Sequence, residues 1–155
     1  MSGTNQGRKF YVCATPQPAD INQAAYESLT FVEVKKIGNV GESGTTTNIV
    51  SYDTMDTEFS QKGKGISNAG DPTVEYARDY TDAGQNALRV AAKTSFIYAT
   101  KTEYDDSPDG ILSNTLIFNR GILTGPTRAN GAVEDFILEV MTFGYVQEEI
   151  VVDPA

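Results

Sequence analysis

An alternation of apolar and polar side chains over the last third of the chain constrains the fold more than any other feature. Successive side chains of a β-strand point to opposite faces of a sheet, so a period of two predicts strands. Segments rich in Gly, Pro, Asp and Asn separate the alternating stretches and are typical of turns. The chain is therefore expected to be mainly β. The expected strands are 95–104, 112–123 and 133–146, with turns at 105–110 and 124–131.

The strand expected over 133–146 has two apolar faces. One face carries Leu138 and Val140, and the other carries Met141 and Phe143. An antiparallel sheet with one face in water would have polar side chains on that face. The second face of this strand is therefore expected to meet a helix, another sheet or another subunit, and the pattern does not choose among them.

One segment has the pattern of an α-helix, at about 82–93. Asp82 is in position to cap it, and Gln85, three residues later, completes the spacing of a capping box. Ala87, Leu88 and Ala91 recur on one face, so the helix is expected to lie close against a sheet. A shorter helical turn is expected over 21–26, with Asp20 as its cap.

The first half of the chain is expected to contain an arm, a hairpin and a long loop. Residues 1–19 form the arm, with an edge strand near Phe10. The hairpin would join strands at 29–37 and 45–50 through a glycine-rich turn. A long polar loop is expected at about 55–72, before a strand at 73–80. The whole chain, 1–155, is expected to be a single domain, with its core at 20–146 and a C-terminal tail at 147–155.

Composition excludes several classes of function. The chain has 12 Lys and Arg against 21 Asp and Glu, a formal net charge of −9, which disfavours tight binding of nucleic acid through phosphate neutralisation. It has no His, and Cys13 is its single Cys, so the usual general base, metal ligand and disulfide are missing. No apolar stretch approaches the roughly 18 residues of a membrane span. We expect no enzyme, no cofactor and no membrane insertion.

Three weaker motifs are better explained as surface structure. The glycines at 38, 41 and 44 precede a strand pattern rather than the helix that a phosphate-binding loop requires. The turn that begins at Asp105 has part of a calcium-loop spacing, but Leu116 occupies the place of the essential Glu. Pairs of carboxylates such as Asp53 with Asp56, or Glu148 with Glu149, arise by chance in so acidic a chain. No catalytic, cofactor-binding or metal-binding residue is therefore predicted.

Two longer stretches resemble the major tail tube proteins of long-tailed, lambda-like bacteriophages. They are AAYESLTFVEVKKIGNVGESGTTTNIVSYDTMDTEFSQKGKG and YARDYTDAGQNALRVAAK, and the similarity extends over about 20–146. In that family an aromatic-Leu-Thr segment leads into a strand and a glycine turn, and a D-A-G-Q-x-x-L-R run opens the helix. The chain differs in having Phe31 where many members carry Trp, and in lacking an immunoglobulin-like domain after the core.

The resemblance implies a β-sandwich or barrel-like subunit with one flanking helix. Such subunits would assemble as six-fold rings stacked into the hollow tube of the virion tail, made in the host bacterial cytoplasm. The loop at 55–72 and both termini would contact neighbouring copies. The tape measure protein and the tail-tip or terminator proteins would be further partners. DNA would pass through the lumen as transient cargo, repelled by carboxylates rather than held.

Three other classes remain open at the level of sequence. The nearest is the tube protein of a contractile tail or of a type VI secretion machine, which has the same tube-forming fold. A monomeric β-sandwich binding module, for example one that recognises carbohydrate, would need an exposed aromatic platform, for which Tyr98, Tyr104 and Tyr145 are candidates. An enzyme is disfavoured by the missing His and by the lack of an intact catalytic motif.

Overall fold

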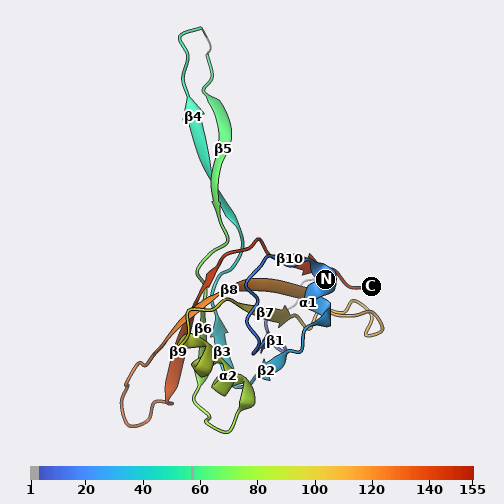
Figure 1. Cartoon of the computed structure of the whole chain (residues 1–155), viewed down its shortest axis with the longest axis vertical. Helices are drawn as coiled ribbons and strands as arrows, with labels where there is room; N and C mark the ends of the chain where they lie inside the picture. The colour runs from blue at the N-terminus through green and yellow to red at the C-terminus, as the bar shows by residue number, and fades with distance from the viewer. Residues whose placement is uncertain (1–3, 57) are drawn as a thin grey trace.

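The protein is mainly β, as the sequence predicts, and the computed structural model describes residues 4–56 and 58–155 (Figure 1). Eight strands form one antiparallel sheet in the order β2-β1-β7-β8-β9-β6-β3, with β10 paired to β8, and β4 and β5 form a separate two-stranded sheet. The elements are β1 (Lys9–Val12), α1 (Gln23–Ser28), β2 (Val32–Val34), β3 (Ile37–Val40), β4 (Thr46–Tyr52), β5 (Gln61–Asn68), β6 (Thr73–Ala77), α2 (Ala83–Ala92), β7 (Tyr98–Glu103), β8 (Leu116–Thr127), β9 (Leu138–Tyr145) and β10 (Ile150–Val152).

The large sheet closes on itself at the corner between β2 and β3. These two strands lie at opposite ends of the strand order, yet only Lys35 and Lys36 separate them in the chain. Three Cα–Cα steps span at most about 11 Å, so the two edges of the sheet must come together. Lys36 turns the corner with a φ of 63°, in the left-handed region that non-glycine residues rarely adopt. The sheet is therefore barrel-like.

The main core fills the inside of this curved sheet. Phe10, Tyr76 and Phe143 are almost completely buried there, and the side chain of Leu88 enters from α2. The helix packs on β8, β2 and β1, as expected for a helix that lies close against a sheet. Along β9 the residues alternate between buried and half-buried, so one of its two apolar faces belongs to this core.

The expectations for α2 are confirmed except for half of the capping box. Asp82 caps the helix, because its Oδ2 accepts a hydrogen bond from the backbone N–H of Gln85 at 3.0 Å. The Gln85 side chain does not reach back to Asp82. Its Nε2 donates to the carbonyl oxygens of Lys35 and Ala77, both at 2.9 Å. Gln85 therefore fastens the helix to the corner between β2 and β3.

A second, smaller cluster lies around α1. Tyr26 stacks on Phe118 with ring centroids 5.1 Å apart, and Cys13 packs beside them. Asn22 caps this helix through a 2.9 Å bond from the backbone N–H of Ala25 to its Oδ1. The expectation that Asp20 is the cap was wrong.

Several expectations for the first half of the chain were also wrong. The segments 29–37 and 45–50 do not form a hairpin, because β2 pairs with β1, β3 pairs with β6 and β4 pairs with β5. The polar loop at 55–72 is shorter than expected, since β5 occupies 61–68. A strand of alternating Lys and Gly has low intrinsic β propensity, and its pairing with β4 overrides that preference.

Strands close to both ends of the described chain are paired more fully than expected. The N-terminal strand β1 is not an edge strand, since it pairs with both β2 and β7. The C-terminal tail returns to the sheet, where β10 pairs with β8. The turn expected at 124–131 begins later, because β8 continues to Thr127 through a shift in its register with β9.

The close approach of α2 to the sheet gives the first prediction. A Cβ built on Gly84 would lie 2.1 Å from the backbone oxygen of Glu33, so Gly84→Ala must push α2 away from β2. We expect a loss of about 2 kcal/mol or more in the free energy of unfolding, measured by urea denaturation. Gly38→Ala is the control, because its nearest neighbour would be 3.8 Å away, and it should change stability by less than about 0.5 kcal/mol. Equal effects of the two substitutions would contradict this packing.

Candidate assembly surfaces

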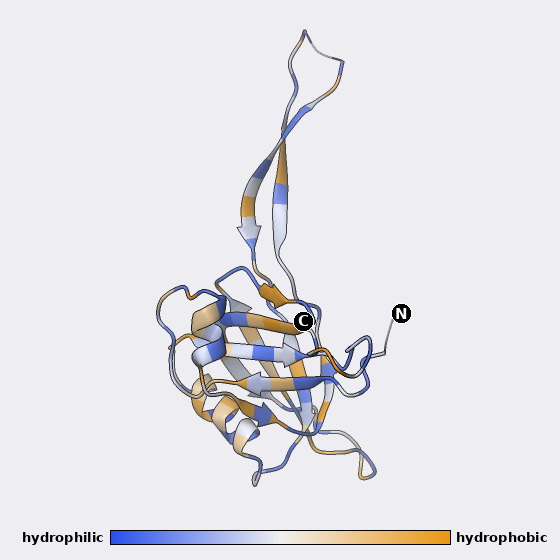
Figure 2. Ribbon diagram, turned by 90° about the vertical axis from the view of Figure 1, so that its right-hand side faces the viewer, coloured by the Kyte–Doolittle hydropathy of each residue, from blue (hydrophilic) through white to orange (hydrophobic). Residues whose placement is uncertain are grey.

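The strands β4 and β5 form a ribbon that projects from the barrel along the longest axis of the molecule (Figure 1). An isolated two-stranded hairpin is at best marginally stable in water, because neither of its faces is covered. The ribbon and its turn nevertheless expose large apolar side chains, and Figure 2 shows apolar stretches along it. A partner that covers these side chains would stabilise it. They are Ile49, Val50, Tyr52, Met55, Phe59 and Ile66.

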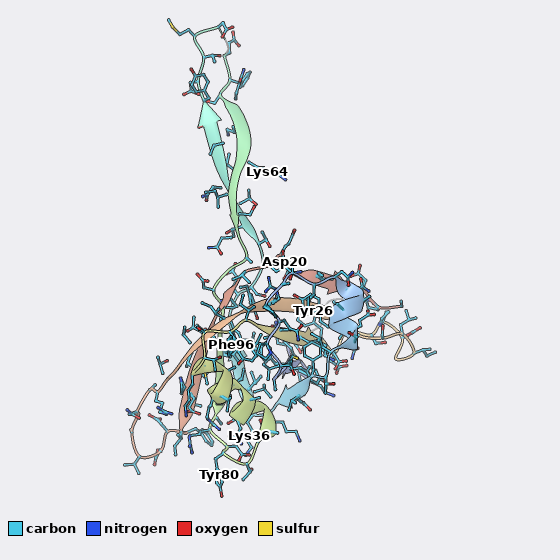
Figure 3. All side chains as sticks on the ribbon, viewed as in Figure 1. Asp20, Tyr26, Lys36, Lys64, Tyr80 and Phe96 are labelled. Carbon is cyan, nitrogen blue, oxygen red and sulfur yellow. The ribbon has the colours of Figure 1, made fainter. Side chains whose placement is uncertain are left out.

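The two faces of the ribbon differ in chemistry. Val50 is paired with Gly63, so its side chain stands beside a position without a side chain of its own. On the other face Ile49 is paired with Lys64, and Ser51 with Lys62 (Lys64 is labelled in Figure 3). One face therefore presents Val50 beside a glycine, while the other carries two ammonium groups beside Ile49.

At the opposite end of the molecule, the loop between β8 and β9 forms a second apolar surface (Figure 1). Val133, Phe136 and Ile137 are exposed there, with Phe136 at 81% and Ile137 at 70%. Arg128 and Phe136 also line a shallow pocket of about 200 Å³ in this loop. The sequence placed Phe136 and Ile137 inside a strand, but β9 begins after them at Leu138.

A buried carboxylate lies behind this loop. The Glu139 side chain is fully buried and forms ion pairs with two arginine side chains. Arg89 donates to Oε1 from Nε at 3.0 Å and from Nη2 at 2.9 Å. Arg128 donates to Oε2 from Nε at 3.0 Å and from Nη2 at 2.8 Å. A third guanidinium, that of Arg78, has its Nε 3.9 Å from Oε1.

These guanidinium groups set the ionisation of Glu139. Burial of the carboxyl opposes ionisation, but the hydrogen bonds and charges of Arg89 and Arg128 outweigh it, so the pKa of Glu139 is lowered. The ionised carboxylate therefore ties together α2, β9 and the end of β8. Sequence reasoning missed this residue. The available signal was a charged residue between Ile137 and Met141 on an otherwise apolar strand face.

A second ionic cluster fixes the segments near the two termini. The Arg120 side chain, only 4% exposed, forms an ion pair with Asp20. It also donates to the carbonyl oxygen of Gln17 at 2.9 Å and to Oε1 of Gln147 at 3.0 Å. Gln147 in turn donates to the carbonyl oxygen of Ile21 at 2.6 Å. The end of the expected arm is therefore bonded to the start of the expected tail.

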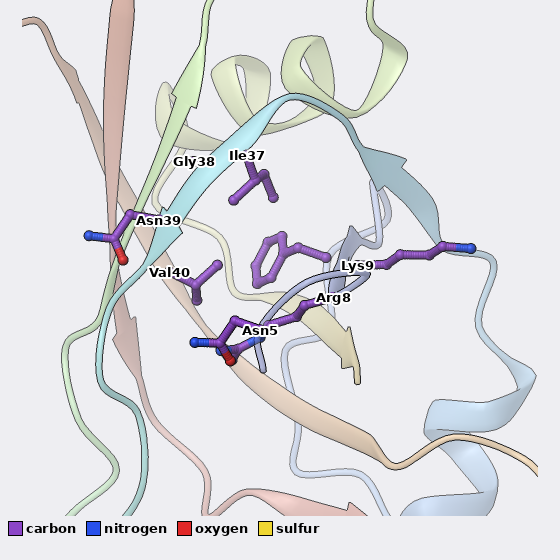
Figure 4. Close-up of a pocket in the computed structure, with 8 residues that line it drawn as sticks. Asn5, Arg8, Lys9, Ile37, Gly38, Asn39 and Val40 are labelled. Atoms are coloured by element: carbon purple, nitrogen blue, oxygen red, sulfur yellow. The ribbon is translucent and has the colours of Figure 1, made fainter. Parts of the chain in front are cut away.

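A cleft lies between β1 and β3, past the end of β2 (Figure 4). It has a volume of about 110 Å³ and is lined by Arg8, Lys9 and Phe10 on one side and by Ile37 and Val40 on the other. The guanidinium of Arg8 lies 4.8 Å from the ring centroid of Tyr104. This space is small for an organic cofactor.

The turn that begins at Asp105 is held by hydrogen bonds of its own carboxylates. In the Asp105 turn, Asp106 accepts bonds from the backbone N–H and the hydroxyl of Thr115, and Asp109 accepts from two backbone N–H groups. These bonds lower the pKa of both carboxyls. Within residues 4–56 and 58–155, no group of three or more His, Cys, Asp or Glu is placed to hold a metal ion.

The aromatic platform of a binding module does not form. The side chains of Tyr98 and Tyr145 are buried, at 4% and 7% exposure, and Tyr145 shares a hydrogen bond with Thr100. Only Tyr104 of the three candidates is partly accessible. In the part of the chain that is described, no helix has the length and apolar character of a membrane span.

Comparison with known proteins identifies the fold as that of phage tail tubes. No protein-family model matches the sequence, and no curated protein matches it. Among solved structures, the chain is similar to the SPP1 tail tube, determined by solid-state NMR and cryo-EM, with a TM-score of 0.70 and 15% identity over 97% of this chain and 78% of that one. It is also similar to a chain of the anti-feeding prophage baseplate, with a TM-score of 0.63 and 8% identity over 99% and 98%.

The buried carboxylate gives the second prediction. Glu139→Gln leaves three guanidinium groups without their anion, and we expect the free energy of unfolding at pH 7 to fall by about 3 kcal/mol. Because the pKa of Glu139 is lowered in the folded state, its contribution is complete above its unfolded pKa of ~4.3 and disappears as the pH falls through the folded pKa. Urea denaturation from pH 7 to pH 2 should therefore show the two proteins converging in acid. A constant difference across this range would contradict the assignment.

Proposed function

We propose that the chain is a tail tube protein, a single-domain structural subunit that polymerises with copies of itself. The observation that carries this proposal is the tail tube fold together with the uncovered ribbon of β4 and β5. A ribbon with six large exposed apolar side chains is stabilised only when another surface covers it. In a tube, a neighbouring copy would supply such a surface.

The subunits would form six-fold rings that stack into a hollow tube in the virion tail. A contact between different surfaces of identical subunits repeats without limit when it does not close, which is the requirement for a tube. Ribbons that are marginally stable before assembly would also slow polymerisation at low protein concentration. Assembly would take place in the host bacterial cytoplasm.

DNA would be the transient cargo of the tube. A formal net charge of −9 supports this role, because carboxylates that face the lumen would repel phosphate groups and let the duplex slide. The tape measure protein and the tail-tip or terminator proteins would be the other partners. In this role the chain has a mechanical rather than an enzymatic function.

A tube protein of a contractile tail or a type VI secretion machine is the second candidate. The similarity to a chain of the anti-feeding prophage baseplate, over 98% of that chain, supports this second candidate. A sheath protein that binds the assembled tube would favour the second candidate. Its absence from purified tails would favour the non-contractile type.

The third prediction concerns the ribbon. We expect the wild-type chain at high concentration to form tubes or stacked rings with a central hole, visible by negative-stain microscopy. Replacing residues 48–66 by Asn-Gly connects the paired residues Thr47 and Ser67 through a two-residue hairpin turn. This variant should form no tubes. Because the ribbon lies outside the barrel, the melting temperature should change little. A wild-type chain that stays monomeric up to its solubility limit, or a shortened chain that still forms tubes, would contradict the proposal.

A further inference from the structure

The cluster around Glu139 carries more positive than negative charge. Three guanidinium groups surround one carboxylate, which leaves two formal positive charges without a partner inside the cluster. The side chains of Arg78 and Arg128 are 43% and 50% exposed, so this excess charge reaches the surface. An anion bound there would be attracted by Arg128, which Glu139 already holds in place, and by Arg78 beside it.

Exposed apolar side chains adjoin these arginines. The backbone N–H of Arg78 donates to the carbonyl oxygen of Ile137 at 2.8 Å, which fixes Ile137 beside Arg78. Phe136 is the residue before Ile137 and lines the same pocket as Arg128. We call this surface the basal patch: Arg78, Arg128, Phe136 and Ile137.

Glu134 and Asp135 share the loop between β8 and β9, and Asp135 lines the same pocket as Arg128, but neither cancels the excess charge by an ion pair. The Asp135 carboxylate accepts a hydrogen bond from the backbone N–H of Ala132 at 2.8 Å. Among the ion pairs of the described residues, none involves Glu134 or Asp135. Lys36 and Asp79 lie nearby and pair with each other at 3.1 Å.

The far end of the ribbon has the complementary chemistry. Met55 and Phe59 are exposed there, at 107% and 84%, and three carboxylates lie among them. None of these carboxylates takes part in an ion pair of the described chain, although Asp53 accepts a hydrogen bond from Ser60. We call this surface the tip patch: Asp53, Met55, Asp56, Glu58 and Phe59.

The tip patch and the basal patch lie at opposite ends of the longest axis of the molecule (Figure 1). A copy displaced along that axis therefore brings the tip of one chain toward the base of the next. The contact joins two different surfaces, so it does not close on a pair and can repeat along a tube. Each patch would gain both an opposite charge and an apolar partner.

We propose that the tip patch of one copy binds the basal patch of another copy. The arginines of the basal patch pair with Asp56 and Glu58, and Phe136 and Ile137 cover Met55 and Phe59. The inference rests on the proposed tube function and specifies which surfaces join. Glu139 is a positioning residue in this contact, because it holds Arg128 toward the partner without touching the partner itself.

A charge-reversal cycle in the full chain tests the contact. Asp56→Lys with Glu58→Lys should raise the protein concentration needed for tubes at least tenfold, measured by sedimentation and negative-stain microscopy. Arg78→Glu should have the same effect, and it leaves Arg89 and Arg128 on Glu139. Combining all three substitutions in one chain should lower the concentration needed for tubes at least threefold relative to either the tip or the basal reversal. Thermal melting of each variant monitors the fold.

The matched control is Glu27→Lys with Glu42→Lys, which makes the same change in net charge at exposed positions outside both patches. It should not raise the concentration needed for tubes. If the wild type forms tubes but the tip and basal reversals assemble like this control, the contact is overturned and the tube function stands. If single reversals block assembly without rescue by the combination, the two patches do not pair. A wild type that never assembles overturns both proposals.

Discussion

Closure of the sheet between β2 and β3 is the constraint on which the rest of the structure depends. Lys35 and Lys36 must carry the chain from one edge of an eight-stranded sheet to the other. The side chain of Gln85 holds this corner by bonding the carbonyl oxygens of Lys35 and Ala77, and it belongs to the helix that covers the core. Sheet closure, helix docking and core burial therefore form one cooperative unit. The ribbon of β4 and β5 lies outside this unit, so it can extend toward a partner without weakening the barrel.

Much of the fold could be predicted because its signals are local. The period of two over 95–104 and 133–146, and the cap and apolar stripe at 82–93, depend on neighbouring residues alone. The errors arose where pairing is not local. Nothing near Phe10 indicates that β1 is paired on both sides, and the Lys-Gly alternation at 61–68 becomes a strand only because β4 lies beside it. The fold class was therefore predictable, whereas the strand order was not.

The assembly surfaces were harder to predict from the sequence than the fold. An exposed apolar residue and a buried one look the same in a sequence, so Phe136 and Ile137 were assigned to a strand rather than to a surface loop. Glu139 was the stronger signal, because a carboxylate on a buried strand face requires cationic partners. Its partners Arg89 and Arg128 come from a helix and from the end of another strand. Only the pairing of β8 with β9 and the packing of α2 on β8 bring them together.

The distribution of charge explains how so acidic a chain can associate with itself. Copies with a formal net charge of −9 repel one another, and at physiological ionic strength salt screens that repulsion beyond a Debye length of ~8 Å. At contact distance the local charges decide the outcome. Glu139 gathers guanidinium groups at one end of the molecule, while the ribbon carries uncovered carboxylates to the other end. Repulsion between acidic surfaces that approach within this distance then opposes random encounters, whereas a head-to-tail encounter gains both ion pairs and apolar burial. The same acidity that keeps free subunits apart is therefore compatible with an ordered, repeating assembly.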